Sequence, residues 1–370
     1  MSTLSVDRMS ASAAPAGTLA IARQVARLRV ETLSHAPAGW DAYVARHPRA
    51  SAYHGTAAVD IARRAFGLRT TFLAARDGSG QIRGVLPLVE QSSALFGRFL
   101  VSVPFFTYGG ILADDQESAS ALAEQAVVHA RERRADHVEL RHTAGLTGVR
   151  FAERLDKVSM VLALPGSVEA LAKQLGSKLR SQVKRADREQ LEIQWGGAEK
   201  IPDFYRVFAP AMHQLGTPVY PQRFFEITCE ALQGLASILV VRVREQVLAA
   251  AIVVRHGATL EVPWAAATPM AKGASVNMRL YWEMLRFAVE SGATAFDFGR
   301  STVGSGTYRF KAQWGAQPKQ LHWHYWLPAG APIPKLNHSN PKYARAAALW
   351  RCMPLWCANI LGPYIVRNLP

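Results

Sequence analysis

Two apolar runs around a short polar turn decide the fold of the second half of the chain: Ile238-Leu-Val-Val-Arg242, the turn at Arg244-Glu-Gln246, and Val247-Leu-Ala-Ala-Ala-Ile-Val-Val254. Apolar, β-branched runs joined by a tight turn are typical of a β-hairpin. The first half repeats the pattern in Phe72-Leu-Ala-Ala-Arg76, Asp77-Gly-Ser-Gly80 and Gly84-Val-Leu-Pro-Leu88. Each half therefore predicts an antiparallel hairpin at an equivalent position.

The elements around each hairpin repeat as well. Two helices are expected before each hairpin, and one amphipathic helix and a short strand after it. Corresponding elements lie 158 to 166 residues apart, with a seam near Pro165; they are 39–46 and 202–214, 56–66 and 221–235, 117–134 and 276–291, and 137–141 and 295–300. The sequence predicts two equivalent α/β domains, each an antiparallel sheet with flanking helices. Two unrelated domains whose elements happen to align remain the alternative.

Composition limits the class of protein. With 370 residues, 49% hydrophobic and 19% charged, the chain is globular rather than disordered and is long enough for two domains. Three cysteines without a CxxC pattern give no disulfide framework, so we expect a reducing compartment. Residues 1–18 lack the apolar core of a signal peptide, and the uncharged stretch 352–366 is too short to span a bilayer.

Positive charge is concentrated toward the end of the chain. The net charge is +15, and the 73 residues after Asp297 carry nine Lys or Arg, five of the nine Trp and no Asp or Glu. Such a balance indicates an anionic ligand or surface. The apolar, Trp-containing stretch 346–370 is either a membrane-interface segment or a segment that docks on the protein's own core.

A basic helix is expected over residues 175–188. Arg180, Lys184 and Arg188 lie four residues apart and share one helical face, beside an apolar stripe. Like charges at this spacing repel, which favours an anionic counterpart such as a phosphate. A solvated helix face is the alternative.

A second segment joins the strand ending at Asp297–Phe298 to a Gly/Ser/Thr loop and a short helix that carries Lys311. Backbone amides of such a loop, together with the Lys311 ammonium, can form an anion or oxyanion site. The spacing is not that of a Walker A motif. Asp297 and Arg300 could instead form a buried ion pair at the strand end.

Further candidate residues flank these segments. Glu261 and Trp264 lie on an expected strand, and Asn277 either caps the following helix or orients a ligand. Tyr108 and Tyr220 lie in aromatic loops of the two halves and are candidates for a cleft wall, or for plain packing. His322 and His324 alternate along an expected strand without a third ligand nearby, so no metal site is predicted.

Two motifs resemble the FemAB-type aminoacyl and acyltransferases. Lys178-x-Arg180-x-x-Val183-x-x-Ala186 is similar to the family's basic helix, and Tyr308-Arg-Phe310-Lys311-x-x-Trp314-Gly315 is similar to its Phe-Lys-x-x-aromatic-Gly motif. The resemblance covers about residues 38–328. It is closest to the branch found with exosortase and exopolysaccharide loci, through Lys178-Leu-Arg-Ser-Gln, Asp297-Phe-Gly-Arg-Ser-Thr and Asn340-Pro-Lys-Tyr343.

The resemblance implies a fold and a domain plan. The fold is α/β (α+β), a tandem duplication of two domains like the Gcn5-related N-acetyltransferases (GNAT), each with a mixed, mostly antiparallel sheet and flanking helices. The expected units are a flexible N-terminal extension at 1–30, GNAT-like domains at 31–165 and 166–330, and a basic aromatic tail at 331–370.

The resemblance also implies transfer of an acyl or aminoacyl group to an amine. Lys311 would stabilise the oxyanion or a donor phosphate, Arg180 and Lys184 would hold a phosphate, and Asp297 or Glu261 would accept the proton. The expected substrate-binding residues are Arg180, Lys184, Arg300, Tyr308, Trp264, Tyr220, Tyr108 and Asn277.

The implied partners are a donor, either acyl-CoA or aminoacyl-tRNA, and an amine-bearing cell-envelope or exopolysaccharide precursor. No tightly bound cofactor and no metal are expected, and the expected location is cytoplasmic, with peripheral contact to the inner membrane as a further hypothesis. The rival hypothesis is a non-catalytic module of transferase fold that grips an anionic polymer or nucleic acid, with binding that weakens steeply with salt.

Overall fold

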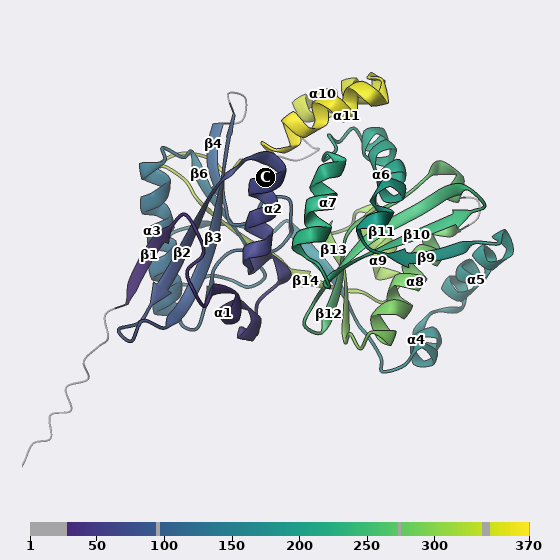
Figure 1. Ribbon diagram of the computed structural model, residues 1–370, viewed down its shortest axis with the longest axis horizontal. Helices are drawn as coiled ribbons and strands as arrows, with labels where there is room; N and C mark the ends of the chain where they lie inside the picture. Colours follow the sequence, from purple (N-terminus) through teal and green to yellow (C-terminus); the bar gives the residue numbers. More distant parts are fainter. Residues whose placement is uncertain (1–27, 94–96, 273–274, 335–340, 370) are drawn as a thin grey trace, which may run out of the picture.

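The computed structural model describes residues 28–93, 97–272, 275–334 and 341–369, and the strands in these ranges form two sheets that lie side by side (Figure 1). The first sheet has the order β1-β2-β3-β4-β6-β15-β7, with β5 paired to β3. Its strands are β1 (Arg29–Leu33), β2 (Arg69–Arg76), β3 (Ile82–Ser93), β4 (Gly97–Val101), β5 (Leu112–Ala113), β6 (His137–His142), β7 (Ala152–Arg154) and β15 (His322–Trp326).

The second sheet has the order β14-β8-β13-β12-β11-β10-β9. Its strands are β8 (Lys157–Ala163), β9 (Glu192–Gly196), β10 (Ala236–Val243), β11 (Gln246–His256), β12 (Thr259–Ala267), β13 (Ala295–Thr302) and β14 (Gln317–Gln320). The apolar run that predicted the second hairpin becomes β11, in the interior of this sheet and almost wholly buried.

Helices cover both sheets. In the described residues the α-helices are α1 (Trp40–Arg46), α2 (Thr56–Phe66), α3 (Gln116–Glu132), α4 (Val168–Gln174), α5 (Ser177–Ala186), α6 (Ile201–Leu215), α7 (Gln222–Ala231), α8 (Val276–Glu290), α9 (Gly306–Ala312), α10 (Pro341–Cys352) and α11 (Leu355–Val366). Short 3-10 turns lie at η1 (Ala52–His54), η2 (Asp187–Glu189), η3 (Ala198–Lys200) and η4 (Pro269–Lys272).

The predicted duplication is confirmed. The hairpins β2–β3 and β10–β11 are antiparallel, and each is preceded by a pair of helices, α1 and α2 or α6 and α7. Each half also contains one parallel strand pair, β4 with β6 and β12 with β13. A long helix precedes the second strand of each pair, α3 in the first half and α8 in the second. Two mixed, mostly antiparallel sheets with flanking helices follow from this repeat, as the sequence predicts.

Two strands interleave the halves. β8 precedes the predicted seam at residue 165 but pairs with β13 and β14 of the second sheet. β15 follows the second half yet returns to the first sheet, between β6 and β7. The boundaries 31–165 and 166–330 therefore remain a proposal, because the two sheets exchange strands across them. Of the predicted extension, residues 1–27 lie outside the described residues, and Arg29 and Val30 already belong to β1.

The two halves share one apolar core. α2 packs against α7, and Arg64 of α2 forms an ion pair with Glu230 of α7 at 2.6 Å. Aromatic rings from both halves meet here, since Phe66 contacts Phe224 and Phe106 contacts Trp264. Burial of large aromatic surfaces stabilises such contacts, so the halves are held in a fixed arrangement.

The C-terminal segment docks on the body of the protein. α10 and α11 pack against α6 (Figure 1), and the buried Gln91 side chain donates to the carbonyls of Arg367 and Leu369. Docking on the protein's own core was one of the two expectations for this tail. In the part of the chain that the structure describes, no helix has the length and apolarity needed to cross a bilayer. Asn340 of the exosortase-branch motif lies outside the described residues.

Candidate active site

A strand divergence in the second sheet creates the candidate site. β12 and β13 pair in parallel only from Thr259–Ala295 to Glu261–Asp297, although both strands continue. At this point β13 also contains a bulge, because its register against β8 shifts between Asp297 and Arg300. Gly299 in the bulge has φ of +76°, a conformation that favours glycine. The strands therefore diverge directly beyond the Glu261–Asp297 pair and leave room between them.

The space between the diverging strands is a pocket of about 430 Å³, here called the central pocket. Both halves of the chain contribute to it, together with the end of the C-terminal segment. Its lining consists of Phe105, Phe106, Thr107, Arg141, Phe208, Met212, Thr217, Pro218, Tyr220, Glu261, Val262, Pro263, Trp264, Ala265, Phe298, Gly299, Arg300, Lys311, Val366 and Leu369.

Lys311 reaches the central pocket from α9. Ser305 caps this helix through the amide of Tyr308, which fixes the start of the helix one turn before Lys311. The Lys311 Nζ donates to the carbonyl oxygens of Gly299 at 2.9 Å and Arg300 at 3.0 Å. An ammonium has three donors, so one remains for a ligand. Burial lowers the pKa of Lys311 to about 8, although Asp297 acts in the opposite direction.

Asp297 is held by three donors. Ser159 Oγ lies 2.5 Å and the Gly299 amide nitrogen 2.7 Å from its carboxylate, and the Tyr108 hydroxyl also donates to it. The alternative ion pair between Asp297 and Arg300 is not formed. The bulge turns the Arg300 side chain to the central pocket, away from the Asp297 carboxylate. Asp297 is thus a tightly bound carboxylate that orients its neighbours.

Glu261 lies between two pockets. It lines the central pocket and also an adjoining pocket of about 400 Å³. The lining of the adjoining pocket includes His54, Tyr108, Ser159 and Asp297. Burial, and then the charge of Asp297, raise the pKa of Glu261 to about 8, while the facing Tyr53 hydroxyl and Lys311 act in the opposite direction. A carboxyl with this pKa can take up or release a proton near neutral pH.

Arg300 stacks on an indole ring. Its guanidinium lies 4.9 Å from the centre of the Trp323 ring, and Arg141 lies 4.7 Å from the same centre. Arg141 is neutralised by Glu139 at 2.7 Å. Within the described residues no carboxylate pairs with Arg300, which stays open to the pocket. The Arg300 side chain is exposed to solvent at the pocket wall, and the surrounding protein, and then the charge of Arg141, lower its pKa. The central pocket therefore presents one uncompensated guanidinium next to Lys311.

Aromatic rings form the rest of the wall. Tyr220 stacks on Phe224 with ring centres 4.5 Å apart, and Phe105 approaches Tyr220 edge-on. Trp264 packs edge-on against Phe224 and lines the pocket. The structure thus places Tyr220 and Trp264 in the pocket wall, whereas Tyr108 borders the adjoining pocket and binds Asp297.

The basic helix is remote from these pockets. α5 packs against α8 at the far side of the second half (Figure 1). Arg180 and Lys184 are exposed on it, and neither lines the central or the adjoining pocket. Arg180 donates instead to the carbonyl of Leu175 at 2.6 Å. The structure therefore does not support a role for these two residues at the reacting atoms. Their spacing in the sequence predicted a shared helical face, but it could not predict where the helix lies relative to the pockets.

Two further residues that were predicted to bind substrate, Tyr308 and Asn277, do not line the central pocket. Tyr308 is half-buried on α9 and packs into the core of the second half. Asn277 is not the cap of α8, because the helix begins at Val276 and Ser275, with φ of +55°, occupies the cap position without a side-chain bond. The cap expectation is therefore wrong by two residues, and Asn277 is half-buried on the first turn.

Some functional candidates were missed from the sequence. Arg141 had a signal in the repeat, since it lies near the end of β6 as Arg300 lies near the end of β13, the corresponding strand of the second half. Trp323, Ser159 and Tyr53 had none, because they come from strands and turns that reach the site only through long-range pairing.

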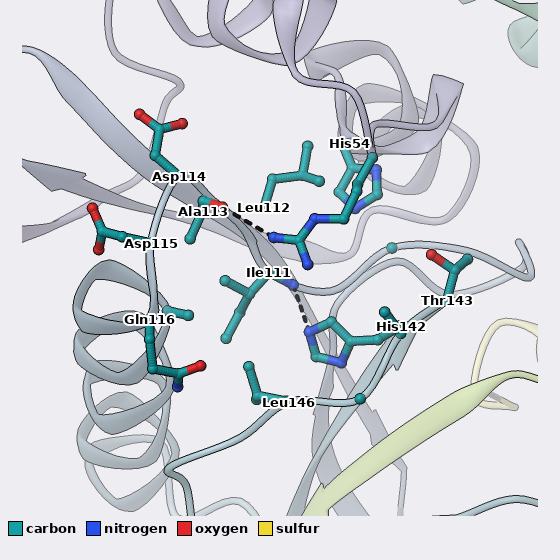
Figure 2. A pocket seen from close by; sticks show the side chains of 15 residues that line it. His54, Ile111, Leu112, Ala113, Asp114, Asp115, Gln116, His142, Thr143 and Leu146 are labelled. Atoms are coloured by element: carbon teal, nitrogen blue, oxygen red, sulfur yellow. Dashed lines mark hydrogen bonds between the residues drawn. The ribbon is translucent and has the colours of Figure 1, made fainter.

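The first half has a pocket of its own (Figure 2). It measures about 270 Å³ and is lined mainly by β5, the start of α3 and the loop after β6. Arg49 donates to the carbonyl of Ala113, and the Ile111 amide donates to His142. Burial lowers the pKa of His54 to about 3 and that of His142 well below its usual value, which favours the neutral form of both rings. Within the described ranges no three His, Cys, Asp or Glu side chains gather as metal ligands.

Comparison with known proteins gives the fold. Residues 173–312 match the family model described as an acetyltransferase (GNAT) domain. The fold is a tandem of two GNAT-like domains. The FemX crystal structure is 15% identical over 80% of this chain and 97% of that chain, with a TM-score of 0.64. A tandem GNAT protein from the clavulanic acid biosynthesis pathway is 12% identical, over 83% of this chain and 100% of that chain, with a TM-score of 0.52.

A third structure supports the same tandem GNAT fold. It is L-PGS from Bacillus licheniformis, 13% identical over 85% of this chain and 96% of that chain, with a TM-score of 0.54. Identities this low establish the fold and no activity. No curated protein matches the chain. The central pocket lies in the half that matches the GNAT domain model, with contributions from the other half.

Proposed function

We propose that the protein is an N-acyltransferase of FemAB type, which transfers an acyl or aminoacyl group to an amine in the central pocket. The observation that carries the proposal is the convergence of Lys311, Arg300 and Glu261 where β12 and β13 diverge. Direct aminolysis of a thioester or ester needs orientation, a proton acceptor and a positive group near the developing oxyanion. These three side chains supply such groups.

The reaction assigns a role to each residue. The amine nitrogen forms a bond to the acyl carbon while Glu261, as the carboxylate, takes the amine proton. The free N–H of Lys311 binds the carbonyl oxygen as it becomes an oxyanion. The C–S or C–O bond of the donor then breaks, the leaving sulfur or oxygen takes the proton from Glu261, and Glu261 returns to the carboxylate. Asp297 orients the bulge and Tyr108, because its carboxylate is already occupied by three donors.

Arg300 is assigned to substrate binding. Its guanidinium has no carboxylate partner among the described residues, whereas the neighbouring Arg141 is paired with Glu139. An unpaired guanidinium in a pocket favours a carboxylate or phosphate of the substrate. Tyr220 and Trp264 would hold the apolar part of the same molecule, since both rings line the pocket.

The donor is proposed to be acyl-CoA, the co-substrate expected of a GNAT domain, with aminoacyl-tRNA as the second possibility. The acceptor is proposed to be an amine-bearing envelope or exopolysaccharide precursor, in line with the exosortase-associated branch that the sequence motifs resemble. A cytoplasmic location and the absence of a tightly bound cofactor remain predictions from the sequence.

One observation favours the rival function. α5 presents Arg180 and Lys184, and the following turn η2 presents Arg188, to solvent on a surface remote from the central pocket. Such a surface could grip an anionic polymer, with or without catalysis elsewhere. For binding through this surface, the logarithm of the binding constant should fall with the logarithm of the salt concentration, and the slope should decrease by about one unit for each phosphate contact removed.

The experiment is a donor and acceptor screen with the purified full chain. Thiol release from a panel of acyl-CoAs is measured with and without amine acceptors, and charged tRNA is tested in parallel. Acceptor-dependent release that is lost in Lys311→Ala supports the transferase. A chain that binds polyanions with steep salt dependence and turns over no donor supports the binding module instead.

A further inference from the structure

The C-terminal helix α11 has two unlike faces. Ala358, Gly362 and Val366 recur every four residues and are buried against the body of the protein. On the opposite side Trp356 is 67% exposed, Ile360 58% and Tyr364 67%. Because residues four apart align along a helix, the outer side is a continuous apolar stripe, here called the α11 stripe.

The orientation of α11 is fixed by its inner face. A Cβ atom at Gly362 would lie 2.8 Å from the carbonyl oxygen of Val219, so only glycine permits this approach. His213 of α6 bonds the carbonyl of Met353 just before the helix, at 2.9 Å. Gln91 holds the carbonyl of Arg367 just after it, at 2.8 Å. The α11 stripe therefore faces outward as part of the folded structure, and not through a frayed helix end.

The charged side chains of the C-terminal segment are all positive. Residues 355–366 contain no charged side chain, and the last acidic residue of the sequence is Asp297. Arg345 and Arg351 on α10 are exposed, and Arg367 follows α11. Soluble proteins rarely leave contiguous large apolar side chains exposed without a partner. The partner of this stripe must therefore tolerate aromatic groups and attract arginines.

An anionic lipid surface fits both requirements. Trp and Tyr are favoured at the boundary between headgroups and acyl chains, and arginines near the surface are attracted to anionic lipid. A second copy of the chain would bring the same arginines together and repel. With 12 residues, α11 is long enough to lie in the membrane interface but too short to cross the bilayer.

We propose that the α11 stripe, flanked by the arginines of α10, docks the protein on an anionic membrane surface. The membrane contact does not depend on the proposed transferase activity. It has a structural link to the central pocket, because Val366 and Leu369 at the end of the same segment line that pocket. Docking would therefore bring the residues of this segment that line the central pocket close to the bilayer.

The test is flotation of the full chain with phosphatidylcholine vesicles, with and without about one third phosphatidylglycerol. We expect flotation with the anionic vesicles, weakened by salt. Trp356→Ser/Ile360→Ser/Tyr364→Ser should remain in the soluble fraction. The matched control is Val128→Ser/Leu155→Ser/Leu235→Ser, which changes three exposed apolar side chains elsewhere and should float like the parent.

Two further measurements keep the test decisive. Circular-dichroism melting shows whether the stripe variant is folded. If it is not, Arg345→Gln/Arg351→Gln leaves the stripe intact and should lose the preference for anionic vesicles. The proposal is overturned if the parent stays soluble with anionic vesicles, or if the folded stripe variant floats equally well. A parent dimer that the stripe variant dissociates, without vesicle binding, identifies a second copy as the occupant and also overturns it.

Discussion

Lys311 and Asp297 meet at the same bulge residue, Gly299. The carbonyl oxygen of Gly299 accepts from Lys311 Nζ at 2.9 Å, and its amide donates to the Asp297 carboxylate at 2.7 Å. One peptide segment therefore sets the position of the cation and of the buried carboxylate at once. The geometry depends on φ of +76° at Gly299, so the bulge itself is part of the site.

Replacing Lys311 should remove transfer without unfolding the protein. Lys311→Ala deletes the proposed oxyanion donor, and loss of one such group typically lowers kcat by about 100- to 1,000-fold. The carbonyls that it leaves face the pocket and can bind water, so the melting temperature should stay within a few degrees. Arg309→Ala, on the exposed side of the same helix, is the control and should keep its activity. Unchanged turnover in Lys311→Ala would exclude the assigned role.

Gly299→Ala should weaken both stability and activity. The site has space, since an added Cβ would lie 3.6 Å from the nearest atom, the carbonyl oxygen of Val262. The cost comes from the left-handed backbone and is about 1–2 kcal/mol. Urea unfolding measures it, with Gly166→Ala as a control at an unstrained, open position. A Gly299→Ala protein as stable and active as the parent would show that the bulge does not set the site.

The pKa of Glu261 predicts two pH dependences. Transfer should rise with pH as Glu261 loses its proton near pH 8, and should fall again as Lys311, also with a pKa of about 8, loses its own. Maximal kcat near pH 8 is therefore expected. In Glu261→Gln the rising limb should disappear together with most of the activity.

The same group affects stability. Its folded pKa of about 8 lies above the ordinary value of 4.5, so the folded state binds the extra proton between these values. Stability should then fall as pH rises from about 5 to 8. Melting temperatures across this range should fall less steeply in Glu261→Gln. Equal slopes in both proteins would mean that Glu261 is ionised in the folded state at neutral pH.

The sequence predicted the elements that depend on local pattern. Both hairpins, the helices around them and the short strands after α3 and α8 follow from apolar spacing and turn residues. The paths of β8 and β15 could not be predicted, because pairing such as His322 with His142 is decided by which sheet edge is free after folding. A strand's own residues do not encode that choice.

The residues of the candidate site also fall into those that the sequence predicted and those that it could not predict. Asp297, Arg300 and Lys311 were predicted because they flank one strand end and the loop after it, and Glu261 because it lies on a neighbouring expected strand. Trp323 was not, since it reaches the pocket only when β15 crosses to the first sheet. Arg180 was predicted at the site and is not there, because α5 turns its basic face to solvent while its apolar stripe packs toward α8.

Arg300 should determine which substrates bind. Arg300→Gln removes the unpaired guanidinium and should raise the KM of a substrate with a carboxylate or phosphate by about 10- to 100-fold, the range expected for a charge-assisted bond of 1.5–3 kcal/mol. A neutral analogue of that substrate should be affected little, and kcat should change less than KM. Arg255→Gln is the control, because Arg255 is a half-buried arginine outside the pocket lining, held by backbone carbonyls of Gly257 and Ser291. Equal losses for charged and neutral substrates would assign Arg300 to the packing of Trp323 rather than to the recognition of an anionic group.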